Sequence, residues 1–376
     1  MSLRILVVPD KFKGTLTAAQ AALAIVDGWR ASRPHDILES IPMSDGGDGF
    51  GDVLSRLFQA EPQTTRTVDA AHRPRDGRWW WEPRERTAII ESAQVVGLAQ
   101  LPEKRFHPFD LDTAGLGPLI EAATALGARR CLIGIGGSAT NDGGFGLARS
   151  LGWTFLDSKD QTIEHWKHLD SLHRVVPPEV SRWPADITVA VDVQNPLLGP
   201  TGASRIYGPQ KGLTESDMPH AEQCLGQLAR TVASASGPVR EPNVPGDGAA
   251  GGLGYGLRKF LGAQLESGFE LFRKHSRLED RIREADLILT GEGSIDASTR
   301  MGKGVGEIAL LAREHSKPCI GFAGVVGPGS NDLFSRLYAM APDLADAQEA
   351  TRHAALWLSR LVRQTAANWR TELDFQ

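Results

Sequence analysis

The stretch RILVVPDKFKGTLTAAQ, residues 4–20, predicts one strand, one loop and the start of one helix. Its apolar run, residues 4–9, is typical of a buried parallel strand. Thr17 and Gln20 have the spacing of a capping box, which predicts a helix whose apolar positions extend to about Trp29. Strand, loop and helix in this order open an α/β unit, so the first residues already favour a parallel sheet covered by helices.

The same alternation recurs along most of the chain. Further strands are predicted at residues 37–41, 131–135, 187–191, 287–290, 319–323 and 337–340. Helices are predicted at 50–58, 116–126, 280–285, 305–315 and 345–369, and the Pro- and Gly-containing stretch 236–256 is predicted to be a connection. Between residues 63 and 96 the pattern changes to a meander of short strands, in which Trp79, Trp80 and Trp81 favour sheet packing.

These changes of pattern predict two domains, which is also what 376 residues favour. We expect residues 1–62 and 285–376 to form one α/β domain with a Rossmann-like parallel sheet, built from the two ends of the chain. Residues 63–284 would form a second, inserted α/β domain. A chain organised in this way would place its active site in the cleft between the domains.

Composition narrows the functional classes. A formal charge of -5 without basic blocks argues against a nucleic-acid partner. Cys131, Cys224 and Cys319 lie far apart in or beside apolar stretches, which predicts buried reduced thiols. Apolar runs stay well below the ~18 residues of a membrane span, and the first residues lack a signal-peptide pattern. We therefore expect a cytoplasmic protein with no membrane partner.

Four segments combine glycine with acidic side chains and with lysine or hydroxyl groups. They are residues 10–15 (DKFKGT), 44–48 (SDGGD), 134–144 (GIGGSATNDGG) and 287–304 (LILTGEGSIDASTRMGKG). Each follows a predicted strand or begins a helix, and loops at the carboxyl ends of strands line the ligand crevice of open α/β sheets. Glycine lets a ligand approach backbone N–H groups closely, and helix N-termini attract anions. We expect the four loops to converge on an anionic ligand.

The charged residues of these loops indicate metal-nucleotide chemistry. Acidic side chains would repel a phosphate unless a cation such as Mg²⁺ lay between them. The acids concerned are Asp45, Asp48, Asp142, Asp192, Glu292 and Asp296. The chain has only ten lysines against 31 arginines, yet Lys11, Lys13, Lys211 and Lys303 all fall in these loops or in GPQKG, residues 208–212. A mobile ammonium group suits a phosphoryl group that moves during a reaction.

Other interpretations of the motifs remain open at this level. Lys303 does not end a P-loop, because that pattern needs glycine at position 297, where Ala297 stands, and a hydroxyl at position 304, where Gly304 stands. Residues 134–139 fit the G-x-G-x-x-A fingerprint of an NAD-dependent oxidoreductase, with Asp157 at a suitable spacing. That alternative is disfavoured because residues 141–144 fall where its helix should run, and glycine is costly there. A third alternative is a non-catalytic sensor of small acids.

Taken together, the motifs resemble one family, the bacterial glycerate kinases of the type that includes the glycerate 2-kinases. The matching segments are VPDKFKG (8–14), MSDGGDG (43–49), residues 134–144, DVQNPL (192–197), PQKG (209–212), GAAGGLG (248–254) and TGEGSID (290–296). The resemblance implies transfer of the γ-phosphoryl group of ATP to D-glycerate, with 2-phosphoglycerate favoured as product. Lys11 departs from the family pattern, which usually has serine there, so it leaves the substrate preference open.

The resulting hypothesis gives each residue a role. Asp192 or Asp296 accepts the proton of the glycerate hydroxyl, Lys13 and Lys303 neutralise the transferred phosphoryl group, and Asp45 and Glu292 hold Mg²⁺. The expected nucleotide-binding residues are Asp10, Gly136, Gly137, Ser138, Thr140, Asn141, Asp142, Thr290 and Gly291. The expected glycerate-binding residues are Asp48, Asn195, Arg205 and Lys211. ATP and glycerate are the expected partners, and a homodimer is left open.

Overall fold

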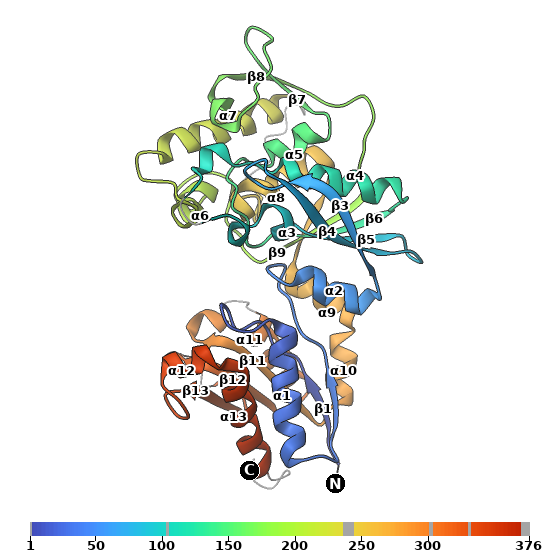
Figure 1. Cartoon of the computed structure of the whole chain (residues 1–376), viewed down its shortest axis with the longest axis vertical. Coiled ribbons are helices and arrows are strands. Elements are labelled where there is room, and N and C mark those ends of the chain that lie inside the picture. The colour runs from blue at the N-terminus through green and yellow to red at the C-terminus, as the bar shows by residue number, and fades with distance from the viewer. Residues whose placement is uncertain (1, 103–104, 236–243, 301–303, 330–331, 370–376) are drawn as a thin grey trace. The chain divides into compact units, whose positions relative to one another are not determined.

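The computed structural model describes residues 2–102, 105–235, 244–300, 304–329 and 332–369 (Figure 1). The chain forms two compact units, of which unit 1 contains Met1–Asp45 and Phe269–Gln376 and unit 2 contains Gly46–Gly268. The chain thus enters unit 2 after Asp45 and returns to unit 1 after Gly268. Both crossing points lie some 16 residues earlier than the boundaries expected from the sequence. The helix α2, Phe50–Phe58, lies in unit 2 because its Gly51 packs against the ring of Trp80.

Unit 1 is built on a five-stranded sheet in the order β13-β12-β11-β1-β2, in which every pair is parallel. The strands are β1 Arg4–Val7, β2 Ile37–Ser40, β11 Leu287–Ile295, β12 Cys319–Val326 and β13 Arg336–Ala341. Strand β1 lies beside β11, with Ile5 opposite Leu287. The prediction of one parallel sheet assembled from both ends of the chain is confirmed.

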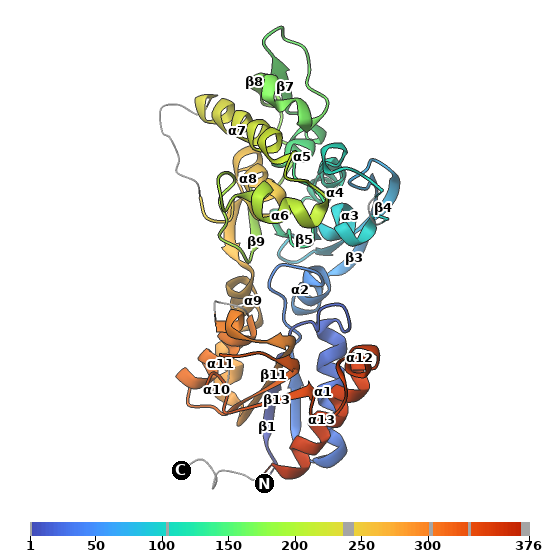
Figure 2. The same ribbon diagram turned by 90° about the vertical axis from the view of Figure 1, so that its left-hand side faces the viewer.

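Helices cover both faces of this sheet. They are α1 Ala18–Ser32, α10 Leu278–Glu284, α11 Gly304–Glu314, α12 Ala347–Arg352 and α13 Ala354–Asn368, and α9 Gly268–Ser276 precedes α10 in the chain. Figure 2 shows the strands between α1 and α13 on one side and α10 and α11 on the other. The capping box is confirmed, since Gln20 N donates to Thr17 Oγ1 at 3.2 Å and Thr17 N donates to Gln20 Oε1 at 2.9 Å. The single terminal helix predicted at 345–369 is wrong, because the non-helical backbone of His353 separates α12 from α13.

Unit 2 has a six-stranded sheet in the order β10-β9-β6-β5-β4-β3. The strands are β3 Glu61–Val68, β4 Pro74–Glu82, β5 Thr87–Glu91, β6 Arg130–Gly134, β9 Asp186–Val191 and β10 Gln264–Ser267. β3, β4 and β5 form the predicted antiparallel meander, and β5, β6, β9 and β10 are parallel. Trp79 packs in the main core and Trp80 against α2, so these tryptophans serve packing as expected.

The remaining elements of unit 2 are α3 Ala93–Val96, α4 Gly117–Ala125, α5 Phe145–Ser150, α6 Ala203–Lys211, α7 Met218–Ala235, α8 Ala249–Leu261, and the small sheet of β7 Thr154–Asp157 and β8 Leu172–Val176. Helices α6 and α7 were not predicted from the sequence. The connection predicted over 236–256 is wrong from residue 249 onward. The backbone of residues 250–252 is left-handed rather than helical, and Gly252 and Gly256 pack directly against the backbone of Gly143 and Gly144, where a side chain would not fit.

The three cysteines are buried and free, as predicted. Within the part of the chain that the structure describes, no helix has both the length and the apolar character needed to cross a membrane.

Candidate functional site

In unit 1, carboxylates gather where the parallel strands end. Asp10 follows β1, Asp45 follows β2, and Glu292 lies in the last half of β11. Asp10 N donates to Gly291 O at 2.9 Å, which fixes the loop after β1 against β11. Lys11 Nζ lies 3.5 Å from Asp45 Oδ1, so an ammonium group stands among the acids. We call Asp10, Lys11, Asp45 and Glu292 the carboxylate cluster.

The electrostatics of the carboxylate cluster favour a further cation. Burial raises the pKa of Asp10 to about 7, and the negative charges of Asp45 and Glu292 raise it too. Lys11 lowers this pKa through its charge and through its backbone N–H, which donates to Asp10 Oδ1 at 2.7 Å, but it does not cancel the effect. A ligand with positive charge would relieve the remaining repulsion.

Neighbouring residues of unit 1 hold this edge of the sheet in shape. Thr299 Oγ1 donates to Glu292 Oε1 at 2.9 Å and accepts from Asp296 N at 3.2 Å. Thr290 Oγ1 donates to Val8 O at 2.7 Å, so this buried hydroxyl joins β11 to β1. Lys13 is exposed in the loop after β1. Lys303 lies outside the described residues.

In unit 2, the loop after β6 packs against residues 46–48 through glycine backbones. Gly136 N donates to Gly46 O at 3.1 Å. A side chain at Gly136 would place its Cβ 2.5 Å from Gly47 Cα, so only glycine fits there, and Gly137, with Asp48 Oδ1 beside it, has a left-handed φ of +76° that favours glycine. Gly137 is exposed and Gly136 partly so. The two glycines offer their backbone, while Asp48 is positioned beside them.

The side chains that follow in the same loop are buried and bind the protein itself. Ser138 Oγ and Thr140 Oγ1 share a hydrogen bond of 2.8 Å. Asn141 Nδ2 donates to Ser204 Oγ at 2.9 Å, and Asn141 Oδ1 has no partner among the described residues. Asp142 is fully buried. In this structure these four side chains hold the loop, and none is open to solvent.

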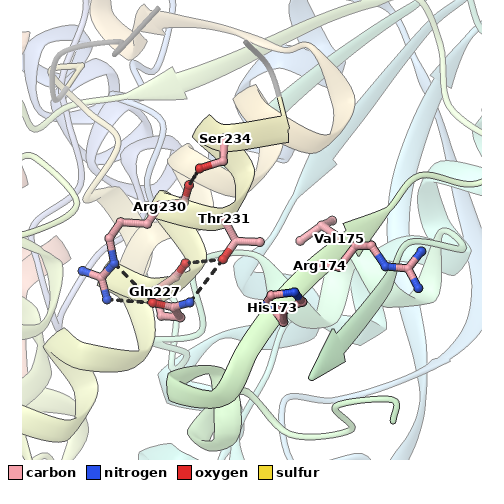
Figure 3. Close-up of a pocket in the computed structure, with 7 residues that line it drawn as sticks. All are labelled: His173, Arg174, Val175, Gln227, Arg230, Thr231 and Ser234. Carbon is pink, nitrogen blue, oxygen red and sulfur yellow. Dashed lines mark hydrogen bonds between the residues drawn. The ribbon is translucent and has the colours of Figure 1, made fainter. Parts of the chain in front are cut away.

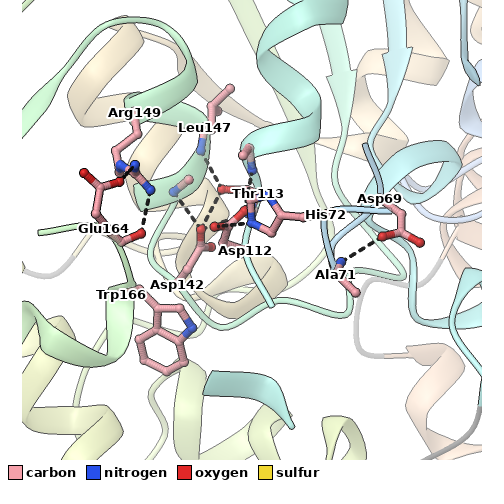
Figure 4. Close-up of polar contacts among 12 residues, drawn as sticks. Asp69, Ala71, His72, Asp112, Thr113, Asp142, Leu147, Arg149, Glu164 and Trp166 are labelled. Carbon is pink, nitrogen blue, oxygen red and sulfur yellow. Dashed lines mark hydrogen bonds and ion pairs between the residues drawn. The ribbon is translucent and has the colours of Figure 1, made fainter. Parts of the chain in front are cut away.

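Asp142 is the centre of a buried polar network (Figure 4). Its Oδ2 accepts from Thr113 N at 3.0 Å, Thr113 Oγ1 at 2.7 Å and Gly146 N at 2.9 Å. Burial raises its pKa to about 6, and the charge of nearby Asp112 raises it as well. Asp112 in turn bonds His72 Nε2 at 2.9 Å. The network therefore links the glycine-rich loop to a half-exposed histidine.

His72 gives unit 2 a pH-dependent stability. The hydrogen bond to Asp112 raises the pKa of His72 above its ordinary value of 6.5, with Arg149 opposing and Asp69 assisting. Because the folded pKa is raised, the pair stabilises the fold fully below about pH 6.5, and the contribution is lost as pH rises through the folded pKa. We expect His72→Gln to lower the melting temperature more at pH 5.5 than at pH 9. A difference that is the same at both pH values would contradict this.

The other expected glycerate-binding residues lie around α6. Lys211 is buried, and its Nζ donates to Thr140 O at 2.6 Å, so it holds the glycine-rich loop. Burial lowers the pKa of Lys211 to about 7, although the charge of Asp142 opposes this. Arg205, by contrast, is exposed and lies 3.7 Å from Glu215.

Asp192 follows β9 and is exposed. Burial raises the pKa of Tyr207, and the charge of Asp192 raises it further, which places this carboxylate near the phenol. Tyr207 OH donates to Asn195 Oδ1 at 2.6 Å. Asp192, Asn195 and Tyr207 thus form a polar group at the carboxyl end of β9.

The structure therefore gathers most of the expected residues into two sets, one in each unit. Unit 1 holds Asp10, Asp45, Thr290, Gly291, Glu292 and Asp296, and unit 2 holds Asp48, residues 136–142, Asp192, Asn195 and Lys211. Residues that the sequence did not single out are Glu91, Asp112, Thr113, Ser204 and Tyr207. Only Glu91 had a recognisable signal, since a carboxylate ends the buried run of β5.

The dinucleotide fingerprint is not supported. The helix after the loop, α5, begins only at Phe145. Asp157 lies in the small sheet, and its Oδ1 accepts from Lys159 N at 2.8 Å and Gln161 N at 2.9 Å, as in an ordinary turn. A surface pocket of about 440 Å³ lies elsewhere in unit 2, between β8 and α7 (Figure 3). No residue that lines it was predicted to be functional, and Gln227 and Arg230 there bond one another.

Comparisons with known proteins agree with the motifs. The sequence model described as "Glycerate kinase family" matches residues 5–370. A protein of Escherichia coli (strain K12) named "Glycerate 2-kinase" is 34% identical over 372 residues, which cover 97% of each chain. A "Glycerate kinase" of Bacillus subtilis (strain 168) is 34% identical over 375 residues, again 97% of each chain. The crystal structure of a candidate glycerate kinase 2 from Salmonella typhimurium LT2 is 31% identical, with a TM-score of 0.81 over 98% of this chain and 97% of that one.

Proposed function

The chain belongs to the glycerate kinase family, and from that premise we propose that it transfers the γ-phosphoryl group of ATP to D-glycerate, with 2-phosphoglycerate as the product. The observation that supports this chemistry best is the carboxylate cluster, in which Lys11 stands among Asp10, Asp45 and Glu292 at the carboxyl ends of parallel strands. The name of the Escherichia coli relative, Glycerate 2-kinase, favours the 2-phosphate over the 3-phosphate.

We propose that Asp45 and Glu292 hold Mg²⁺ directly or through water. Among the residues that the structure describes, no group of three or more Asp, Glu, His or Cys side chains is arranged as a metal site. The pair Asp45 and Glu292 suits Mg²⁺ in kinases, which usually binds one or two carboxylates together with the phosphates of the nucleotide. The raised pKa of Asp10 marks unrelieved negative charge at the same place. The bound ion would neutralise charge on the transferred group.

On the side of the nucleotide, the backbone of Gly136 and Gly137 and the ammonium groups of Lys13 and Lys303 would contact phosphate. Gly136 N already donates to Gly46 O, so Gly136 would allow close approach of the phosphate, and the exposed backbone of Gly137 would contact it without the bulk of a side chain. Thr140, Asn141 and Asp142 would act indirectly, because their buried side chains fix the shape of this loop.

On the side of glycerate, we propose Asp192 as the group that accepts the hydroxyl proton, with Asp296 as the alternative. Asp192 lies near Tyr207 and Asn195, whose polar groups suit a small hydroxy acid. Exposed Arg205 is the accessible cation for the glycerate carboxylate, and Asp48 would bind a second hydroxyl. Lys211 would hold Thr140 and so position the loop.

The direct test measures ADP release in a coupled assay with MgATP and a panel of hydroxy acids. We expect turnover with D-glycerate and much less with L-glycerate, glycolate or lactate. Phosphorus NMR of the product then identifies the phosphorylated carbon. Absence of ADP release with every acid would contradict a kinase, whereas a 3-phosphoglycerate product would contradict only the regiochemistry.

A further inference from the structure

Glu91 is a buried carboxylate that the proposed mechanism does not use. It ends β5 and is 3% exposed. Its Oε1 accepts from Gly49 N at 3.2 Å and its Oε2 accepts from Gly51 N at 3.0 Å. Gln94 Nε2 also donates to Oε1, at 3.4 Å. Both carboxylate oxygens are therefore committed to the start of α2, where backbone N–H groups have no partner within the helix.

These two hydrogen bonds act on the segment that carries Asp48. Gly49 is the N-cap of α2, and it has a left-handed backbone with no side chain to cap the helix, so Glu91 supplies the missing acceptor from another strand. Asp48 immediately precedes this cap. Burial raises the pKa of Glu91, and the negative charge of Asp48 raises it further. The position of Asp48 beside Gly137 thus depends on a carboxylate anchored in the sheet.

The strand that bears Glu91 also holds the other glycine-rich loop. Ser92 N donates to Gly134 O at 2.8 Å, and Gly136 N donates to Gly46 O at 3.1 Å. A closed chain of contacts runs from β5 to the start of α2, through residues 46–48 to the loop after β6, and back to β5. Moving its anchor by an ångström would displace Asp48 together with the backbone of Gly136 and Gly137.

We propose that Glu91 is a positioning residue for the phosphoryl transfer, which fixes residues 46–49 and, through them, the loop after β6. Glutamine has nearly the shape of glutamate but presents an NH₂ group to one of the two backbone N–H groups. Two donors then face each other, so the start of α2 must shift or lose one hydrogen bond. A misplacement of about 1 Å can lower a rate by ~10²-fold.

The chain contains a matched control for this proposal. Glu82 is 5% exposed, and its oxygens accept from Arg84 N at 2.8 Å and Glu85 N at 2.7 Å. It therefore makes the same pair of hydrogen bonds, in the turn between β4 and β5, and this turn contains none of the proposed site residues. Glu82→Gln should destabilise the fold for the same reason as Glu91→Gln without moving the glycine-rich loops.

The experiment compares Glu91→Gln and Glu82→Gln in the full chain. We expect both to lower the melting temperature, whereas only Glu91→Gln lowers kcat/KM for D-glycerate by at least about tenfold. Hydrogen exchange is measured in parallel and should speed up at residues 46–51 in Glu91→Gln alone. Equal kinetics and equal exchange in the two variants would overturn the proposal. If Glu91→Gln does not fold, Glu91→Asp and Glu82→Asp replace the pair, with the same expectations.

The kinetic part of this inference rests on the proposed function, and the two can fail separately. If the natural enzyme phosphorylates none of the hydroxy acids, the proposed function is wrong, and hydrogen exchange still decides whether Glu91 fixes residues 46–51. If the natural enzyme is active and Glu91→Gln matches Glu82→Gln in both measurements, only the role of Glu91 is wrong.

Discussion

Replacing Asp192 by Asn is expected to lower kcat by about 10²- to 10⁴-fold, the usual contribution of general-base catalysis. Asparagine keeps the size of the side chain but cannot accept a proton from the glycerate hydroxyl. Because the exposed side chain stands near Tyr207 rather than in the core, the fold should survive the change. The KM values for ATP and glycerate should change much less than kcat, since the lost interaction belongs to the transition state.

The measurement is steady-state kinetics on folded protein, with Asp186→Asn as the control. Asp186 is exposed at the opposite end of the same strand, where it pairs with Arg130 at 3.1 Å, so its substitution should leave kcat unchanged. If kcat of Asp192→Asn falls by less than about tenfold, Asp192 is not the base. The same substitution at Asp296 then tests the alternative.

Replacing Asp142 by Ala is expected to lower the free energy of unfolding of unit 2 by about 3–5 kcal/mol. The substitution removes the acceptor for four buried donors, namely Thr113 N, Thr113 Oγ1, Gly144 N and Gly146 N, and leaves a cavity in place of the carboxylate. A buried donor without a partner costs about 1–3 kcal/mol. Chemical denaturation followed by tryptophan fluorescence measures the loss. A loss below about 1 kcal/mol would mean that the network does not hold the loop.

Asp142→Asn is the informative companion, because it keeps one oxygen and removes the titrating group. The folded pKa of Asp142 is raised to about 6 from an ordinary 3.8. The folded state therefore holds the proton more tightly than the unfolded state, and the natural protein loses stability as pH rises from about 4 to 6. The asparagine variant should not show this loss, so the stability difference should shift in its favour between pH 4 and pH 7. A difference independent of pH would contradict the raised pKa.

Local patterns predicted much of the fold and only part of the site. The parallel sheet of unit 1 follows from short apolar runs and from the capping box at Thr17, all of which are signals within a few residues. Helix α8 could not be predicted in this way, because its first residues include the left-handed Gly251 and Gly252, which pack against a loop about a hundred residues earlier.

The roles of the site residues could also be predicted only in part, for a different reason. An acidic residue in a glycine-rich loop looks the same in the sequence whether its carboxylate binds a ligand or bonds to other groups of the protein. Asp45 and Asp142 were both expected to contact the ligand, yet Asp142 is buried among donors of its own unit, while Asp45 stands beside Lys11. Which direction a carboxylate faces depends on residues such as Thr113, which no local motif marks.

The order of strands in unit 1 has a consequence for folding during synthesis. Strands β1 and β2 are made first, but β1 also pairs with β11, which is made much later. In this pairing Ile5 of β1 lies opposite Leu287 of β11. Unit 2 is complete once Gly268 has left the ribosome, whereas the last hundred or so residues need roughly 5–20 s more. During that interval the apolar residues of β1 lack their partner strand. Unit 2 can therefore fold first, while β1 and β2 wait for β11 to complete the sheet of unit 1.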